Sequence, residues 1–175
     1  SPDVAAHILR NLPEDTKRSV LSRLSESKDV APLLEYQHDE AGGLMTPEFI
    51  AIDEEMTVEQ SMAFVRRGGR KLHPNDISQL FVTNRQGILV GTVDLARLVL
   101  APPSQRISLF IQPDSIFSVP VLTDQEQCGR LMERYNLRRL AVVDKNGKLL
   151  GVLKLENMIN VLEDEGIVNE VTEEL

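Results

Sequence analysis

The chain contains two copies of one sequence pattern, and this internal repeat limits its possible folds more than any other feature. Segments 80–100 and 140–160 each predict a strand, a glycine-containing turn, a second strand and a helix. Equivalent positions stand sixty residues apart, as in the pairs Leu80–Leu140 and Gly91–Gly151. The repeat is considered before other sequence features, because each copy folds as one structural unit and the copies together determine the fold. Two copies are too few for a solenoid, so the sequence predicts a paired domain with pseudo-two-fold symmetry.

The front parts of the two copies align at a larger offset, and the difference locates an insertion. Pro47 corresponds to Pro113 and Ile50 to Ile116, an offset of 66. The first copy therefore carries about six extra residues within segment 66–77. Because insertions collect in surface loops, we expect an exposed loop there. It contains a positive cluster, formed by Arg66, Arg67, Arg70 and Lys71. This cluster is either solvated, paired with the acidic C-terminal end, or directed at an anionic surface.

The residues before the repeat predict three short helices. Asp3 is a candidate cap for a first helix whose apolar residues Val4, Ile8 and Leu12 are spaced by four. A second and a third helix follow up to residue 36, the third capped by Asp29. Helices of about ten residues are marginal alone in water, so these apolar faces must pack on something. The chain opens without Met, which indicates a fragment or a processed chain. If it is a fragment, we expect part of that packing partner to be missing.

Caps and turns mark the elements inside the repeat. Helix starts are predicted at Thr57, Asp94 and either Thr123 or Asp124. Strands are predicted over 49–52, 77–83, 88–93 and 117–122. Gly87 is suited to a turn that requires positive φ. Pro120 interrupts the last of these strands, which predicts an edge position in its sheet.

Composition excludes several classes of protein. Apolar residues make up 42% and aromatic residues only 4%, so the core has to be aliphatic and stacking platforms for nucleic acid are scarce. A net charge of −8 lacks the basic footprint of a nucleic-acid-binding protein. Cys128 has no second cysteine with which to form a disulfide. No apolar run approaches the ~20 residues that a membrane-spanning helix needs.

Three segments carry a resemblance to a known family. Residues 87–91 and 147–151 each place two glycines around aliphatic residues just before a predicted helix. Within a tandem strand-helix-strand-strand-helix unit, this pattern resembles a CBS domain pair. The string EAGGLMTPEF at residues 40–49 is similar to the signature that joins the helical N domain to the CBS pair in MgtE magnesium transporters. The resemblance covers nearly the whole chain.

The resemblance implies a mixed α+β fold in which a short all-helical segment precedes a tandem CBS pair. It implies the end of the helical N domain at 1–38, CBS domain 1 at 39–104, CBS domain 2 at 105–164 and the start of a connecting helix at 165–175. The expected function is that of a cytosolic Mg²⁺-sensing and gating region of an MgtE-like transporter or channel, on the cytoplasmic side of the cell membrane. The alternative is a nucleotide-responsive or scaffold CBS protein without a transport role.

Two partners follow from the same resemblance. One is a C-terminal transmembrane domain of the full-length chain. The other is a second copy of the chain, because family members form homodimers through their CBS helices. The candidate interface residues are Leu95, Leu98, Val99, Leu155, Met158, Ile159 and Leu162. No nucleic-acid partner is expected.

Acidic residues are the candidate ligands for Mg²⁺, which prefers oxygen ligands and relieves repulsion between close carboxylates. The candidates from the residues alone are Glu126, Glu156, Glu163, Asp164 and Glu165. A solvated charged face is the alternative interpretation. The resemblance implies metal roles for Glu126, Glu165, Asn136, Asn157 and Asn160, the last three aligning with family aspartates. An amide brings no charge, so we expect Mg²⁺ sensing that is weak, displaced or lost.

The positions that bind adenosine nucleotides in many CBS pairs depart from the family pattern. Asp94 and Lys154 stand where a Ser or Thr hydroxyl is expected, and Arg97 and Asn157 stand where the ribose carboxylate is expected. Only Asn157 partly fits, so the sequence argues against an adenosine nucleotide. Lys154 or Arg97 could instead meet a phosphate, although a surface role is the simpler interpretation.

Catalysis has little support in the sequence. His7, His38 and His73 are far apart in the chain, and none lies in a recognisable motif. Cys128 lies on the predicted apolar face of a helix with Met132, which is typical of a core residue. No Asp or Glu pair is placed as an acid and a base. We therefore expect a protein that is not an enzyme.

Overall fold

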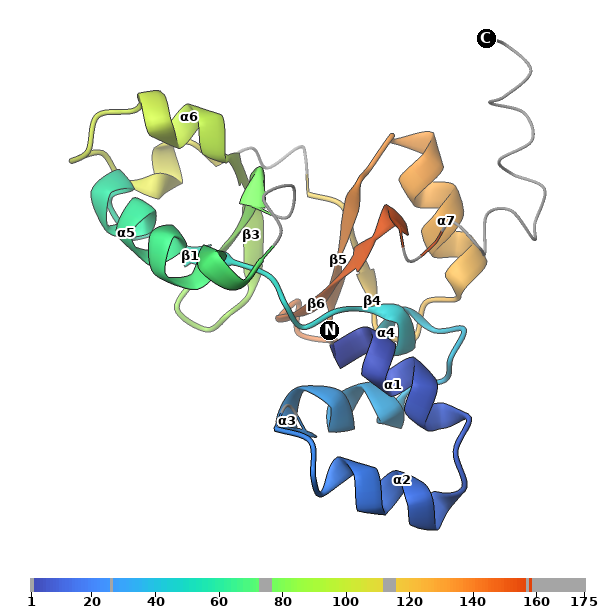
Figure 1. Cartoon of the computed structure of the whole chain (residues 1–175). Coiled ribbons are helices and arrows are strands. Elements are labelled where there is room, and N and C mark those ends of the chain that lie inside the picture. Colours follow the sequence, from blue (N-terminus) through green and yellow to red (C-terminus); the bar gives the residue numbers. More distant parts are fainter. Residues whose placement is uncertain (1, 26, 73–76, 112–115, 157, 159–175) are drawn as a thin grey trace, which may run out of the picture. The chain divides into compact units, whose positions relative to one another are not determined.

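The computed structural model describes residues 2–25, 27–72, 77–111, 116–156 and 158 (Figure 1). Helices and strands alternate in two similar halves after an N-terminal run of helices, so the expected mixed α+β class is confirmed. The described residues fall into two compact units. One unit contains residues up to 47, residues 118–142 and residues from 150 on, and the other contains residues 48–117 and 143–149. No helix in the part of the chain that the structure describes has the length and apolar character needed to cross a membrane.

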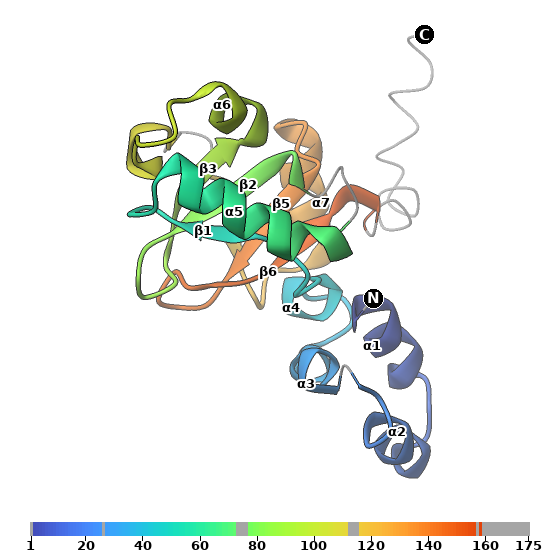
Figure 2. The same ribbon diagram turned by 60° about the vertical axis from the view of Figure 1, so that its left-hand side comes forward.

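The first repeat forms a three-stranded sheet in the order β1-β2-β3. Its strands are β1 (Ala51–Asp53), β2 (Gln79–Thr83) and β3 (Leu89–Asp94). β1 runs parallel to β2, and β3 pairs with β2 in the antiparallel direction. Helix α5 (Val58–Gly68) lies along one face of this sheet (Figure 2). Its buried Val58 and Val65 join the aliphatic core of this unit.

The second repeat forms a sheet in the order β4-β5-β6. Its strands are β4 (Ser118–Pro120), β5 (Arg139–Val143) and β6 (Leu149–Lys154), and the helix between the first two is α7 (Gln125–Arg134). Pro120 ends the edge strand β4, as predicted. Cys128 and Met132 on α7 are buried, which confirms the prediction that Cys128 is a core residue.

In the described part of the chain, four short helical elements precede the segment that leads into the first repeat. They are α1 (Pro2–Arg10), α2 (Glu14–Leu21), α3 (Ser27–Val30) and η1 (Ala31–Glu35), and Figure 1 shows α1, α2 and α3 grouped together. Helix α1 buries Pro2, Ala6 and Leu9. The predicted apolar face was wrong, because Val4 and Ile8 are 54% and 57% exposed. The four-residue spacing correctly predicts a helix, but Ala6 and Leu9 are the side chains that face inward.

Two other boundaries differ from the prediction. The third helix begins at Ser27, so Asp29 lies inside it and does not cap it. Arg66 and Arg67 occupy the last turn of α5, where the sequence predicted a loop. Basic side chains favour the C-terminal end of a helix, and this preference explains why the helix continues past the aliphatic pattern. A short 3₁₀ helix, η2 (Gly69–Lys71), follows.

The predicted turn and two of the predicted caps are confirmed, whereas Asp3 lies inside α1 and does not cap it. Thr57 and Gln60 form a capping box at the start of α5, and the Asp124 carboxylate accepts from the Glu126 backbone N–H at the start of α7. Helix α6 (Leu95–Leu100) follows Asp94, whose side chain makes no capping hydrogen bond. Gly87 has a φ of 80°, the left-handed conformation that the turn requires.

Candidate functional site

The segment that joins the helical elements to the first repeat is docked on the second repeat. Its helix α4 (Ala41–Leu44) contains two buried glycines. The backbone N–H groups of Ala41 and Gly42 donate to the carbonyl oxygens of Thr123 and Val121, each at 2.8 Å. A Cβ atom at Gly43 would lie 1.9 Å from the Gln37 carbonyl oxygen. Gly43 of the linker is therefore required by the close approach of neighbouring backbone.

The residues after α4 continue this attachment along strand β6. Thr46 and Val152 form an antiparallel bridge in which each backbone N–H donates to the carbonyl of the other, at 2.9 and 3.0 Å. The Met45 side chain covers Gly151, where a Cβ atom would lie 2.5 Å from the methionine sulfur. Gly151, which belongs to the repeated hairpin pattern, therefore also leaves room for the linker side chain of Met45.

Arg10 holds the linker from the opposite side. Its Nη1 donates to the Gly43 carbonyl at 3.0 Å, and its Nη2 donates to the carbonyl oxygens of Leu33 and Tyr36 at 2.5 and 3.4 Å. Burial lowers the pKa of the Arg10 guanidinium below its usual value, because desolvation disfavours the charged form. Nothing in the sequence indicated this role, since a basic residue in the last turn of a helix is ordinary.

Two of the expected metal positions are described, and the structure does not bring them together. Glu126 lies in the first turn of α7, where its carboxylate pairs with Arg130 at 3.0 Å. Asn136 lies beyond the other end of α7, about 15 Å away at 1.5 Å rise per residue. Its φ of 50° is left-handed, a conformation that Asn tolerates better than most residues. Helix termination thus gives a backbone reason for an Asn at this position.

The other expected metal positions lie mostly outside the described residues. These are Asn157, Asn160, Glu163, Asp164 and Glu165. Glu156 is described and exposed. Within the described residues, no three His, Cys, Asp or Glu side chains form a group that could hold a metal ion. The described candidates therefore do not fit a Mg²⁺ site by themselves.

The expected nucleotide positions are divided between the two compact units. Asp94 and Arg97 belong to the unit of the first repeat, and Lys154 belongs to the other. Asp94 is half-buried at the end of β3, and Arg97 is exposed on α6. Lys154 ends β6 and is half-buried. The fourth position, Asn157, lies outside the described residues.

The possible catalytic side chains occupy inert or unremarkable positions. Burial raises the pKa of the Cys128 thiol to about 12, with a smaller contribution from the Asp124 carboxylate. A thiol with so high a pKa is a poor nucleophile at neutral pH. His7 and His38, which are 31 positions apart in the chain, line one pocket with Arg10. His73 lies outside the described residues.

Comparison with known proteins shows which family the two repeats and the linker belong to. The CBS domain family matches residues 41–103 and 111–164. The cytosolic domain of the Mg²⁺ channel MgtE, solved in complex with ATP, is 32% identical to the chain with a TM-score of 0.71, over 93% of this chain and 76% of that one. The chain is a CBS domain pair of the MgtE magnesium transporter family. The resemblance that the linker string and the paired hairpins carry is therefore confirmed.

Other MgtE proteins agree with this assignment. The magnesium transporter MgtE of Thermus thermophilus is 39% identical over 137 residues, which are 78% of this chain and 30% of that protein. MgtE of Bacillus subtilis is 31% identical over 140 residues, or 79% of this chain and 30% of that protein. The crystal structure of the soluble part of a magnesium transporter has a TM-score of 0.85 at 28% identity, over 94% of this chain and 64% of that one. The chain spans about 30% of the length of these curated MgtE relatives.

Proposed function

We propose that the chain is the cytosolic regulatory region of an MgtE-like magnesium transporter, in which it gates transport and catalyses no reaction. The observation that carries this proposal is the docked linker. In an MgtE-type CBS pair, it ties the helical elements to the second repeat through backbone hydrogen bonds from Ala41, Gly42 and Thr46. A rearrangement of the second repeat would move these bonds, and the helical elements would follow because Arg10 holds the same linker.

The Mg²⁺ response of this region is proposed to be weaker than the carboxylate-rich pattern of the family implies. Asn136 supplies no negative charge, and Asn157 and Asn160 replace expected aspartates. Mg²⁺ affinity depends on the number of charged ligands. Glu126 already has a partner in Arg130, with which a cation would have to compete. Isothermal titration of Mg²⁺ into the chain should therefore give weak or undetectable heat, and tight saturable binding would refute the proposal.

The domain limits implied by the resemblance remain part of the proposal. The helical N-domain end is assigned to 1–38, the CBS domains to 39–104 and 105–164, and the connecting helix to 165–175. A transmembrane domain would follow in the full-length protein. The cheapest check is the reading frame beyond Leu175, where several apolar runs of about 20 residues are expected. Their absence would favour a CBS protein without a transport role.

The gating role is tested in the full-length protein by breaking the bridge between the linker and β6. Substitution of Thr46 by Pro removes the backbone N–H that donates to the Val152 carbonyl at 2.9 Å. In proteoliposomes, the T46P protein should transport Mg²⁺ at internal Mg²⁺ concentrations that close the wild-type pore. Glu48→Pro provides a nearby proline control outside that bridge. Equal inhibition of wild type and T46P would contradict transmission through the linker.

Nucleotide binding is not part of the proposed function. The MgtE cytosolic domain with ATP shows that the architecture accepts a nucleotide in that relative. In this chain, a carboxylate at Asp94 would repel phosphates, and Arg97 replaces the acidic group expected at the ribose. Excess ATP or AMP should leave the melting temperature unchanged. A ligand at about 100 times its Kd adds about 2.7 kcal/mol, so a shift of several degrees would overturn this conclusion.

A further inference from the structure

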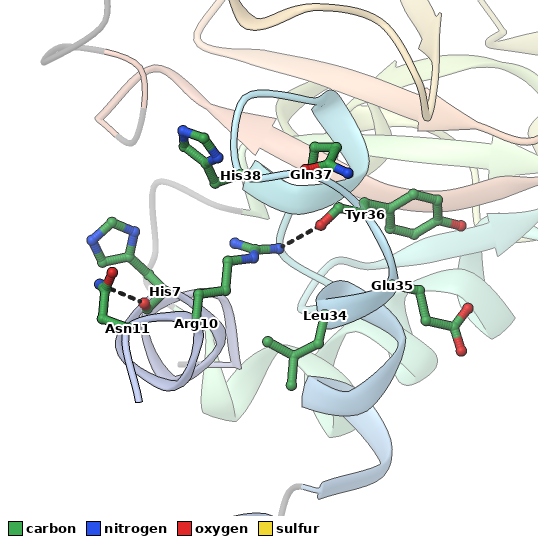
Figure 3. Close-up of a pocket in the computed structure, with 8 residues that line it drawn as sticks. All are labelled: His7, Arg10, Asn11, Leu34, Glu35, Tyr36, Gln37 and His38. Atoms are coloured by element: carbon green, nitrogen blue, oxygen red, sulfur yellow. Dashed lines mark hydrogen bonds between the residues drawn. The ribbon is translucent and has the colours of Figure 1, made fainter. Parts of the chain in front are cut away.

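A polar pocket lies between helix α1 and the segment 34–38, within a single compact unit (Figure 3). Its volume is about 420 Å³. His7 and Arg10 line it from α1, Asn11 lines it from the position just after α1, and Gln37 and His38 line it from the opposite side. The Arg10 guanidinium extends from α1 into the space between the two walls (Figure 3).

The positive charge of Arg10 has only neutral oxygen partners among the residues that the structure describes. Its three acceptors are the backbone carbonyls of Leu33, Tyr36 and Gly43. Its buried Nε–H has no hydrogen-bond acceptor within the described part of the chain. Carbonyl dipoles satisfy the N–H groups, but they do not neutralise a charge as a carboxylate or a phosphate would. The pocket therefore surrounds a half-buried cation for which the described residues supply no counter-ion.

Four other lining residues carry hydrogen-bond donors suited to an oxyanion. Asn11 and Gln37 each carry amide N–H₂ groups, and the imidazoles of His7 and His38 can each donate through a ring N–H. Asn11 uses one amide hydrogen for the His7 carbonyl at 3.3 Å, which leaves the second available. Donors around an arginine are the usual arrangement for binding phosphate.

The acidic groups near the pocket do not neutralise Arg10. Glu35 contributes to the lining, but Figure 3 shows its side chain directed away from the guanidinium. The Asp39 carboxylate lies 4.0 Å from His38 Nδ1, which is the longest separation expected for an ion pair. A divalent cation is excluded as the natural occupant, because the half-buried guanidinium would repel it. The chemistry of the site is therefore opposite to that of a Mg²⁺ site.

We propose that the pocket between α1 and segment 34–38 binds a phosphate-class oxyanion through Arg10, Asn11 and His38. The phosphate is either free inorganic phosphate or the phosphate group of a nucleotide. The occupant would join α1 to the segment that leads directly into the linker helix α4, so its binding would strengthen the hold of the helical elements on the linker. This site is separate in sequence and in chemistry from the expected Mg²⁺ and nucleotide positions of the CBS repeats.

The test is a titration of the ¹⁵N-labelled chain with inorganic phosphate, followed by amide and arginine Nε–H NMR signals. Saturable shifts are expected for the amides of residues 34–38 and for the Arg10 Nε–H. A parallel titration with AMP distinguishes the two phosphate sources. Saturation of the same signals at lower AMP than phosphate concentration would identify a nucleotide phosphate, whereas the reverse order would identify free phosphate.

Two variants show whether the proposed groups hold the anion. His38→Ala removes a side chain that is 76% exposed, so the fold should be unaffected. Arg10→Lys keeps the charge but loses the forked donor geometry. Each should weaken phosphate binding about tenfold, or about 1.4 kcal/mol. Arg23→Ala, at an exposed arginine of the same helical segment, is the matched control and should bind normally.

Two outcomes would overturn the proposal. One is the absence of saturable shifts at residues 34–38 with either phosphate source. The other is unchanged phosphate affinity in both His38→Ala and Arg10→Lys, as judged by the same signals. Either result would leave Arg10 with a purely structural role, in which it holds the Leu33, Tyr36 and Gly43 carbonyls.

Discussion

At the scale of single residues, side-chain size decides whether the linker can dock on the second repeat. Gly42 and Gly43 are both buried, and each faces a neighbour that leaves no space for a methyl group. Gly42 faces the Tyr36 ring, where a Cβ atom would lie 2.5 Å from Cγ. A ring can rotate or shift, but the backbone carbonyl opposite Gly43 is fixed by the chain. Gly43 is therefore the more demanding of the two positions.

Substitution of Gly43 by Ala should destabilise the protein strongly. The new methyl group would overlap the Gln37 carbonyl oxygen, at 1.9 Å, and the linker would have to move. Overpacking of this kind costs about 1–3 kcal/mol in the free energy of unfolding, which chemical denaturation can measure. Gly68→Ala is the control, because nothing lies within 4 Å of its Cβ position and its φ of −78° suits any residue. That control should be neutral or gain about 0.4–1 kcal/mol.

Cys128 should resist alkylation in the folded protein. The pKa of its thiol, raised to about 12 by burial, keeps it protonated at pH 8, and only the thiolate reacts quickly. Iodoacetamide labelling followed by mass spectrometry should therefore be slow in buffer and fast in denaturant.

Because the unfolded thiol ionises near pH 8.5, this group lowers the free energy of unfolding as pH rises from that value toward 12. Cys128→Ala should remove this part of the pH dependence of unfolding. Equal labelling of Cys128 in buffer and in denaturant would contradict the protection of the thiol by the fold.

At the scale of elements, the two repeats fold by the same local rules, and those rules were visible in the sequence. The glycine of each turn adopts positive φ, 80° at Gly87 and 78° at Gly147. The two turns also pair with each other, since Leu89 donates to the Gly147 carbonyl and Leu149 donates to the Gly87 carbonyl. Local turn chemistry needs only a few adjacent residues, so a single sequence is sufficient to predict it.

Two features that the sequence did not reveal depend on contacts between distant segments. The inward face of α1, which buries Ala6 and Leu9, is set by its packing on α3, η1 and α4. The role of Arg10 depends on carbonyl groups 23, 26 and 33 positions away. Neither contact leaves a periodic signal in the sequence. The acidic metal candidates came from their charge, and the Asn and nucleotide positions came from the resemblance. All of these site positions stay predictions.

The capping box of α5 gives a test at this scale. Thr57→Ala removes the side-chain oxygen that accepts from the Gln60 N–H at 3.2 Å. It should lower the free energy of unfolding by about 0.5–2 kcal/mol, as measured by urea denaturation. Asp94→Ala is the matched comparison, because Asp94 also precedes a helix but makes no capping hydrogen bond. A loss at position 94 as large as that at position 57 would contradict the importance of the cap hydrogen bonds.

At the scale of the whole molecule, the exposed apolar side chains bear on the proposed homodimer. The sequence placed Leu95, Leu98 and Val99 of α6 at the interface. The structure buries Leu98 in the core of its own unit, so it cannot contact a partner. Val99 and Leu100 are instead 63% and 87% exposed on the same helix. The proposed interface on α6 is therefore formed by Val99 and Leu100.

Leu100→Glu should convert the dimer to a monomer. A charge placed at this position has to be desolvated in a closed interface but stays hydrated in the monomer, so the penalty falls on the dimer alone. Sedimentation velocity over a series of protein concentrations should show the wild type as a dimer and L100E as a monomer, with equal circular dichroism spectra. Leu122→Glu is the control, because Leu122 is 66% exposed but lies outside α6, and this variant should still dimerise. A wild-type chain that stays monomeric throughout the series would exclude a stable homodimer of this region, whereas a dimer that survives L100E would place its interface elsewhere.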